Sequence, residues 1–204
     1  MKEEKNMEAL ILEAATELFL KKGFAATSTT EIAKHAGCNQ ALVHYYYRTK
    51  DKLFEAIFEK KITKFIDSLM VGYDQGLSFE ERLAFKIGSH FDMLAENPKL
   101  PVLLFSEIST NPHRLGLFRE ALQDRPQKVL ASLNEDLQLE IARGNVREMS
   151  VYDLILDIIS LNVIMFLMEV PFKAITKMSE AEYKAMLERR KEENITLILK
   201  GIKS

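Results

Sequence analysis

Residues 28–47 of this 204-residue chain read STTEIAKHAGCNQALVHYYY, and the stretch predicts two short helices around a glycine turn. Ser28 and Glu31 fit an S-x-x-E capping box, in which the hydroxyl accepts from the Glu31 amide and the carboxylate accepts from the Ser28 amide. Gly37 suits the turn, and Asn39 is a favourable N-cap for the second helix. An isolated pattern of this kind more often marks an ordinary helical hairpin than a DNA-binding helix-turn-helix. The side chains of the second helix are therefore needed to distinguish the two.

The second helix carries the side chains that a reader of the DNA major groove needs. In a helix-turn-helix, the N-terminal end of the second helix meets the base edges. Asn39 and Gln40 are suited to bidentate contact with adenine, and Ala41 is small enough for close approach. Groups able to bind phosphate follow, namely His44, Tyr45, Tyr46 and the ammonium of Lys50. These residues predict a helix-turn-helix that binds DNA.

Two neighbouring stretches closely resemble the DNA-binding domain of the TetR family of repressors: residues 23–37, GFAATSTTEIAKHAG, and residues 42–53, LVHYYYRTKDKL. The resemblance covers about residues 8–60. It implies that Ser28, Thr29 and Thr30 contact phosphates or bases, that Asn39, Gln40, Ala41 and Leu42 face bases, that His44, Tyr45 and Tyr46 lie along the DNA backbone, and that Lys50 binds phosphate. His44 departs from the family pattern, which usually has a tyrosine that touches phosphate there. Two interpretations stay open for it, a pH-dependent DNA affinity and a neutral structural histidine.

The remainder of the chain shows helical spacing and no strand-like alternation. A first helix is predicted from about residue 6 to residue 22, and a long one over about residues 50–70. Later helix starts are predicted at Ser78, Asn97-Pro98, Asn111-Pro112, Pro126, Ser150 and Ser179, and Pro171 is expected to end or kink the helix that precedes it. We therefore expect an all-α fold with a three-helix DNA-binding domain over residues 1–52 and a helical ligand-binding and dimerisation domain over residues 71–204.

Composition limits the other function classes. The net charge of −2 argues against a protein that coats nucleic acid by bulk charge, and the single cysteine, Cys38, fits a reducing cytoplasm. The N-terminus lacks the features of a signal peptide, so a cytoplasmic protein is expected. Residues 151–170 approach the length of a membrane span, but Asp153, Asp157 and Glu169 interrupt them, which favours a helix covered by protein.

The family resemblance also implies a homodimer and a small-molecule effector. Helices over about residues 151–170 and 179–200 would pair with their copies, and residues 151–170 are indeed apolar on more faces than one core can hide. Candidate ligand residues, each of which is more often plain core, are His90, Phe91, Leu94, Phe105, Glu107, Phe118, Asn162, Met165 and Phe166. Asn162 has a second interpretation, as a residue that sets the dimer register. The mix of Met and Phe favours an apolar or amphipathic ligand.

No motif for catalysis, a metal or a cofactor is found in the sequence, and the four histidines at positions 35, 44, 90 and 113 belong to none. We therefore expect no enzyme, but a ligand-responsive regulator, with repression favoured, that binds a roughly palindromic operator as a dimer. The alternative is a helical dimeric binding or scaffold protein without sequence-specific DNA function.

Overall fold

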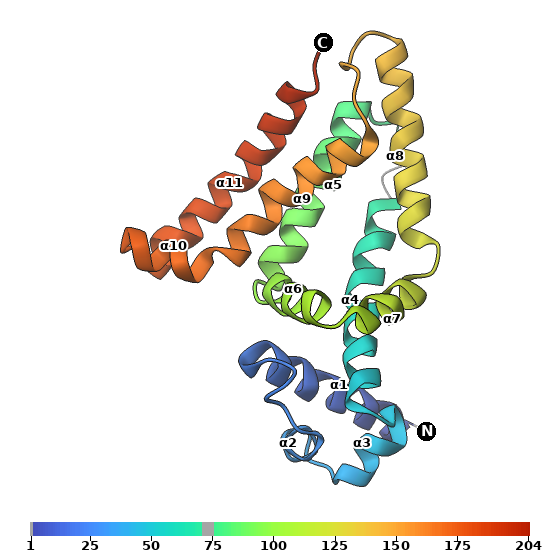
Figure 1. Cartoon of the computed structure of the whole chain (residues 1–204), viewed down its shortest axis with the longest axis vertical. Coiled ribbons are helices and arrows are strands. Elements are labelled where there is room, and N and C mark those ends of the chain that lie inside the picture. Colours follow the sequence, from blue (N-terminus) through green and yellow to red (C-terminus); the bar gives the residue numbers. More distant parts are fainter. Residues whose placement is uncertain (1, 71–75) are drawn as a thin grey trace. The chain divides into compact units, whose positions relative to one another are not determined.

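The structure, a computed structural model, describes residues 2–70 and 76–204, and of residues 2–6, 64, 65, 68, 70, 112, 113, 117, 118 and 121 it describes the backbone alone. These residues form helices and one isolated bridge between Val146 and Lys203, so the predicted all-α fold is confirmed (Figure 1). The helices are α1 (Lys2–Lys22), α2 (Thr29–His35), α3 (Gln40–Tyr47), α4 (Lys50–Met70), α5 (Phe79–Glu96), α6 (Leu100–Thr110), α7 (Pro112–Leu122), α8 (Arg125–Ala142), α9 (Val151–Leu167), α10 (Glu169–Thr176) and α11 (Glu180–Gly201).

The chain divides into two compact units. The head unit comprises the chain up to Thr63 together with Val102–Gln123, and the C-terminal unit comprises Lys64–Pro101 and Asp124–Ser204. The sequence had placed the segment after residue 71 in one C-terminal domain. In the structure, α7 and most of α6 pack with the head unit instead, for reasons of charge that the next subsection describes.

Aromatic side chains form the core of the head unit. Phe19 of α1, Phe24 of the following loop and Phe54 of α4 meet with ring centroids 5.1–5.7 Å apart, and Phe58 lies 4.4 Å from Phe54. Such pairs add about 0.5–1.5 kcal/mol each to the free energy of burial. The cluster therefore anchors the long helix α4 to the N-terminal helices.

Local signals predicted most helix starts correctly. The capping boxes at Ser28, Ser78 and Ser179 are all complete, and Ser150 caps the first turn of α9. The prediction at Asn97 was wrong, since α6 begins only at Leu100. Asn97 instead ends α5, where its side-chain amide donates to the Met93 carbonyl at 2.9 Å and satisfies one of the free carbonyls of the last turn.

The apolar segment near residue 170 is broken rather than continuous. α9 ends at Leu167, and α10 follows at an angle of 61°. Pro171 accounts for the break because its ring clashes with the carbonyl four residues earlier, that of Leu167. Within the described residues, no single helix is long and apolar enough to cross a membrane, and α9 with α10 meets the length and composition criteria only as this bent pair.

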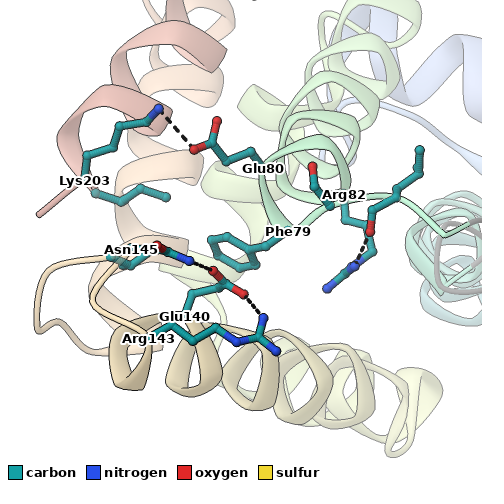
Figure 2. Close-up of a pocket in the computed structure, with 11 residues that line it drawn as sticks. Phe79, Glu80, Arg82, Glu140, Arg143, Asn145 and Lys203 are labelled. Carbon is teal, nitrogen blue, oxygen red and sulfur yellow. Dashed lines mark hydrogen bonds and ion pairs between the residues drawn. The ribbon is translucent and has the colours of Figure 1, made fainter.

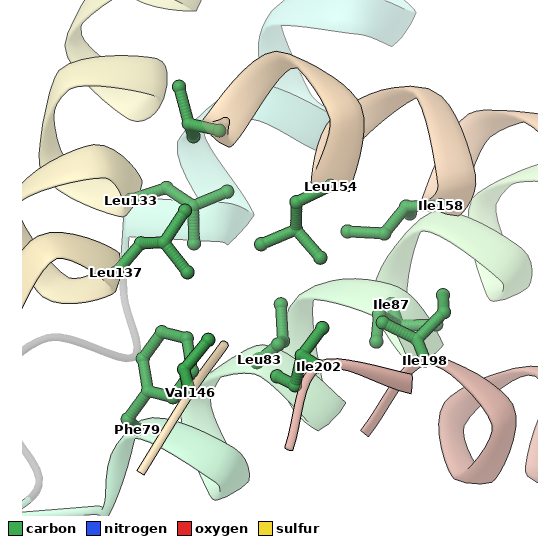
Figure 3. Packing of buried hydrophobic residues seen from close by; sticks show 11 residues of the cluster. Phe79, Leu83, Ile87, Leu133, Leu137, Val146, Leu154, Ile158, Ile198 and Ile202 are labelled. Carbon is green, nitrogen blue, oxygen red and sulfur yellow. The ribbon is translucent and has the colours of Figure 1, made fainter. Parts of the chain in front are cut away.

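The C-terminal unit is built around α5, α9 and α11, which lie side by side, with α8 covering one end (Figure 1). Its largest hydrophobic cluster is drawn from these four helices and from the segments at residues 146 and 202 (Figure 3). Its buried members are Phe79, Leu83, Ile87, Leu133, Leu137, Val146, Val151, Leu154, Ile158, Ile198 and Ile202.

Candidate nucleic-acid interface and ligand site

The N-terminus of α2 presents three hydroxyl residues. Ser28 is the N-cap, and its Oγ accepts from the Glu31 amide at 3.2 Å and donates to Glu31 Oε2 at 3.0 Å. Hydrogen bonds from Lys22 and Ser28 lower the pKa of Glu31 to about 2, so the cap carboxylate is ionised at neutral pH. Because the Ser28 hydroxyl is engaged in the cap, Thr29, which is half-buried, and Thr30, which is exposed, offer the other hydroxyls at this end.

Gln40, the first residue of α3, joins these two threonines. Its Nε2 donates to Thr29 Oγ1 at 3.0 Å, and its Oε1 accepts from Thr30 Oγ1 at 3.2 Å. One turn later, His44 Nε2 lies 3.3 Å from Gln40 Nε2, and His44 Nδ1 lies 3.0 Å from the Arg48 carbonyl. The structure thus brings four predicted DNA-binding residues into one exposed hydrogen-bonded network.

The other residues at the start of α3 divide between cap, surface and core. Asn39 Oδ1 accepts from the Leu42 amide at 3.0 Å, so the N-cap predicted at Asn39 is present. This bond uses one of the two lone pairs of Asn39 Oδ1 and fixes the direction of its carboxamide. Ala41 is exposed, Leu42 is half-buried, and Val43 is buried in the core of the head unit.

The three tyrosines that end α3 are placed differently. Tyr45 is 74% exposed, and its ring meets that of Tyr46 edge-on at 5.2 Å. Tyr47 turns toward α1, where its hydroxyl donates to the Glu8 carbonyl at 3.4 Å. Burial, with a smaller effect of Glu8, raises the pKa of Tyr47 to about 12. Tyr45 is therefore the member of this group that is most accessible to a DNA backbone.

Lys50 has partners within the chain. Its Nζ donates to the carbonyls of Phe24 and Thr27 at 2.9 and 2.8 Å and lies 4.2 Å from the centre of the Phe24 ring. Burial lowers the pKa of this ammonium. In this arrangement Lys50 holds the loop before α2 against α4, which differs from the phosphate contact that the family resemblance implies.

Arg114 of α7 is a residue that the sequence did not single out. Its guanidinium stacks over the Phe24 ring, pairs with Asp51 at 3.0 Å and forms a second ion pair with Glu107 of α6. The Arg114 side chain is 11% exposed, and that of Glu107 is 14% exposed. The contacts of Arg114 with Phe24 and Asp51 join α7 to the N-terminal part of the head unit, and its pair with Glu107 joins α7 to α6. Since buried charges need partners, these contacts account for the packing of α7 and most of α6 with the head unit.

The predicted ligand residues fall into separate groups. Phe91, Leu94 and Phe166 form a buried cluster of the C-terminal unit, against which Met165 packs, and the rings of Phe91 and Phe166 meet at 5.5 Å. By contrast, Phe105 and Glu107 belong to the head unit, where Phe105 is exposed. The side chain of Phe118 lies outside the described residues.

A groove of about 520 Å³ runs beside the buried cluster. Phe91, Phe166, Tyr183 and Leu187 provide its apolar surface, and the charged residues at its rim are Asp92, Glu169, Glu180, Lys184, Glu188 and Lys191. The volume falls within the range of small-molecule sites.

Asn162 and His90 take part in a buried polar network. Asn162 Nδ2 donates to the Ile87 carbonyl at 3.0 Å and to His90 Nδ1 at 3.2 Å, while its Oδ1 accepts from Asn194 Nδ2 at 2.9 Å. Arg190 donates in turn to Asn194 Oδ1 at 2.7 Å. These bonds give Asn162 its polar partners within one chain. Burial lowers the pKa of His90 to about 4, so its imidazole is neutral at pH 7.

A second pocket, of about 650 Å³, lies where the start of α5 meets the end of α8 and the C-terminus (Figure 2). Four of its charged residues pair with one another, Lys203 with Glu80 at 3.1 Å and Glu140 with Arg143 at 2.6 Å, and Arg82 pairs with Asp136 at 2.9 Å. A polar site with matched charges does not suit an apolar effector, which leaves the groove beside Phe91 as the better ligand site.

Comparison with known proteins gives a consistent picture. Residues 11–57 match the family described as "Bacterial regulatory proteins, tetR family". The "Fatty acid metabolism regulator protein" of Bacillus subtilis is 24% identical over 148 residues, which cover 72% of this chain and 75% of that protein. The negative regulator IcaR of the biofilm operon icaADBC in Staphylococcus epidermidis is 24% identical over 131 residues, covering 64% of this chain and 67% of the relative. Among solved structures, the regulator FadR from Bacillus subtilis in complex with stearoyl-CoA has a TM-score of 0.73 at 21% identity, over 95% of this chain and 98% of that one.

Proposed function

Since the chain belongs to the tetR family of bacterial regulatory proteins and is a ligand-responsive transcriptional regulator, we propose that it acts as a homodimer on a roughly palindromic operator. The operator is released when an amphipathic molecule binds the C-terminal unit. The observation that carries the DNA-binding part is the exposed network at the start of α2 and α3, where Thr29, Thr30, Gln40 and His44 lie together. Short polar groups at the N-terminal end of a recognition helix are what direct base readout requires.

The exposed face of α9 supports the homodimer. The helix buries one stripe, Val151, Leu154, Ile158, Asn162 and Phe166, within its own unit. On another face Tyr152, Leu156 and Ile159 are exposed, and Ile164 of α9 and Leu197 of α11 are exposed as well. Large apolar side chains that are exposed on one helix in this way are typical of an interface, and a second copy of α9 and α11 is the occupant that we propose. A two-fold dimer would present its recognition helices to half-sites about one helical turn, roughly 34–36 Å, apart.

We propose that the effector carries a long apolar portion. Aromatic and aliphatic side chains line the groove beside Phe91, and methionines 93 and 165 pack on the same cluster. Methionine adapts to irregular apolar ligands. The names of the Bacillus subtilis relatives, a fatty acid metabolism regulator and a FadR bound to stearoyl-CoA, favour an acyl compound.

Release from the operator requires that the effector bind one arrangement of the dimer better than another. α4 is the candidate lever, because its residues up to Thr63 belong to the head unit and those from Lys64 onward belong to the C-terminal unit. A ligand that binds the protein and leaves operator affinity unchanged would contradict this part of the proposal.

Selection of genomic fragments with the purified protein tests the DNA-binding function. We expect enrichment of a palindromic sequence and an affinity that falls steeply with salt concentration, because phosphate contacts release counterions. The alternative, a helical scaffold protein, predicts no salt-sensitive binding to any duplex. Thermal-shift measurements with stearate, stearoyl-CoA and polar metabolites then test the effector, and stabilisation by polar metabolites alone would count against an apolar ligand.

A further inference from the structure

The carboxamide of Gln40 is nearly saturated by its own chain. A glutamine side chain offers two N–H donors and two carbonyl lone pairs. Nε2 lies 3.0 Å from Thr29 Oγ1 and 3.3 Å from His44 Nε2, so both N–H groups have an acceptor. Oε1 accepts one bond, from Thr30 Oγ1 at 3.2 Å. One carbonyl lone pair therefore remains for a partner outside the chain.

The direction of the bond between Gln40 and His44 follows from the other side of the imidazole. His44 Nδ1 lies 3.0 Å from the carbonyl oxygen of Arg48, which can only accept. Nδ1 therefore carries the proton, and Nε2 of the neutral ring is an acceptor. Gln40 and His44 are four residues apart and share one face of α3, so the ring holds the amide nitrogen turned toward itself.

We propose that His44 is a positioning residue for Gln40 rather than a phosphate ligand, and that Gln40 reads an exocyclic amino group of a base through its remaining lone pair. In the major groove, only adenine N6 and cytosine N4 offer a donor, whereas guanine and thymine present acceptors. Gln40 thus selects adenine or cytosine on the strand that it contacts. This inference rests on the proposed DNA-binding function and adds the rule by which one base is chosen.

The same count of donors and acceptors predicts a change in selectivity. Bidentate reading of adenine needs a carbonyl oxygen for N6–H and a free N–H for N7. In this chain His44 and Thr29 occupy both N–H groups of Gln40. Removal of the His44 acceptor frees one of them, so adenine gains a second bond and cytosine gains none. A variant without the imidazole is therefore more selective for adenine than the natural chain.

The test uses the full-length protein and duplexes that carry the selected operator. The relevant base pair is the one at which Gln40→Ala abolishes the preference, and the dissociation constant is then measured with each of the four bases there. We expect the natural chain to bind adenine and cytosine with similar affinity and to bind guanine and thymine about tenfold more weakly. His44→Phe should bind adenine about tenfold more tightly than cytosine.

Two further variants separate positioning from general structure. His44→Gln keeps an acceptor at similar reach and should retain the preference of the natural chain. His35→Phe is a matched control, because His35 is an exposed histidine of α2 that bonds Glu17 Oε2 at 2.8 Å and lies outside the Gln40 network. This variant should bind the four duplexes with the same relative affinities as the natural chain.

The outcomes distinguish this inference from the proposed function. A natural chain that prefers guanine or thymine at the Gln40 position overturns the inference and leaves the regulator intact. So does a His44→Phe variant that weakens all four duplexes equally, which is the behaviour of a lost phosphate contact. If the natural chain binds no duplex selectively, the proposed function itself fails before any variant is measured.

Discussion

The guanidinium carbon of Arg114 lies 3.7 Å from the centre of the Phe24 ring, which places a cation of α7 on the aromatic core of the head unit. The same group pairs with Asp51 of α4 and with Glu107 of α6. Four segments of the head unit, the loop after α1 and helices α4, α6 and α7, are therefore tied together at one charge. A displacement of α6 or α7 would therefore break contacts of the Arg114 guanidinium.

Arg114→Leu should lower the free energy of unfolding by about 2–4 kcal/mol, because it removes a cation–π contact and leaves the nearly buried Glu107 unpaired. Urea denaturation measures the loss. Arg119→Leu is the control, since Arg119 is an exposed arginine of the same helix and its replacement should have little effect. If Arg114→Lys unfolds at the same urea concentration as the natural chain, the planar geometry of the guanidinium is not what stabilises this site.

Lys50→Met should destabilise the head unit by about 1–3 kcal/mol, because the apolar stem stays while the two bonds to the carbonyls of Phe24 and Thr27 are lost. Urea denaturation and the salt dependence of operator binding are measured together. Lys52→Met is the control, since Lys52 is exposed and pairs with Glu55 on the same helix. Unchanged stability with a smaller salt slope would instead make Lys50 a phosphate ligand.

His90 should make stability depend on pH in mild acid. Burial holds its pKa at about 4, whereas an unfolded imidazole titrates near 6.5, so between these values the unfolded chain binds more protons. The contribution of this residue, up to about 3 kcal/mol, is present above pH 6.5 and is lost as the pH falls toward 4. Unfolding free energies measured across this window should show a shallower slope for His90→Asn. Equal slopes would mean that the folded protein accommodates the imidazolium.

Leu156→Glu should convert the dimer into a monomer at micromolar concentration, because a carboxylate would be buried in the proposed interface. Sedimentation velocity measures the mass. Leu139→Glu is a matched control, since both leucines are exposed, at 62% and 56%, but Leu139 lies on α8, away from the stripe on α9. Dissociation by both variants, or by neither, would argue against an interface centred on Leu156.

Much of the secondary structure could be predicted because the signals are local. A capping box such as that of Ser179 involves two residues three positions apart, and a proline acts on the turn before it. The failure at Asn97 has the same origin. Its side chain could start one helix or end another, and only the packing of α5 decided between these uses.

The candidate DNA-binding residues were also predictable as a set, because the order of residues on a recognition helix determines which side chains lie at its N-terminal end. Their hydrogen-bond partners could not be predicted from the sequence. Lys50 meets a carbonyl 26 residues away, and Asn162 meets one 75 residues away. No spacing rule links partners at such distances.

The sequence by itself therefore determined an all-helical chain, the positions of its helices and a groove-reading pair of helices at residues 28–47. Only the tertiary structure decided that Lys50 binds the loop before α2, that Arg114 holds α6 and α7 to the head unit, and that Gln40 keeps a single free lone pair. The reason is physical. Helix formation depends on bonds between near neighbours, whereas the pairing of a charge or a carboxamide depends on which distant groups the fold brings within about 3 Å of it.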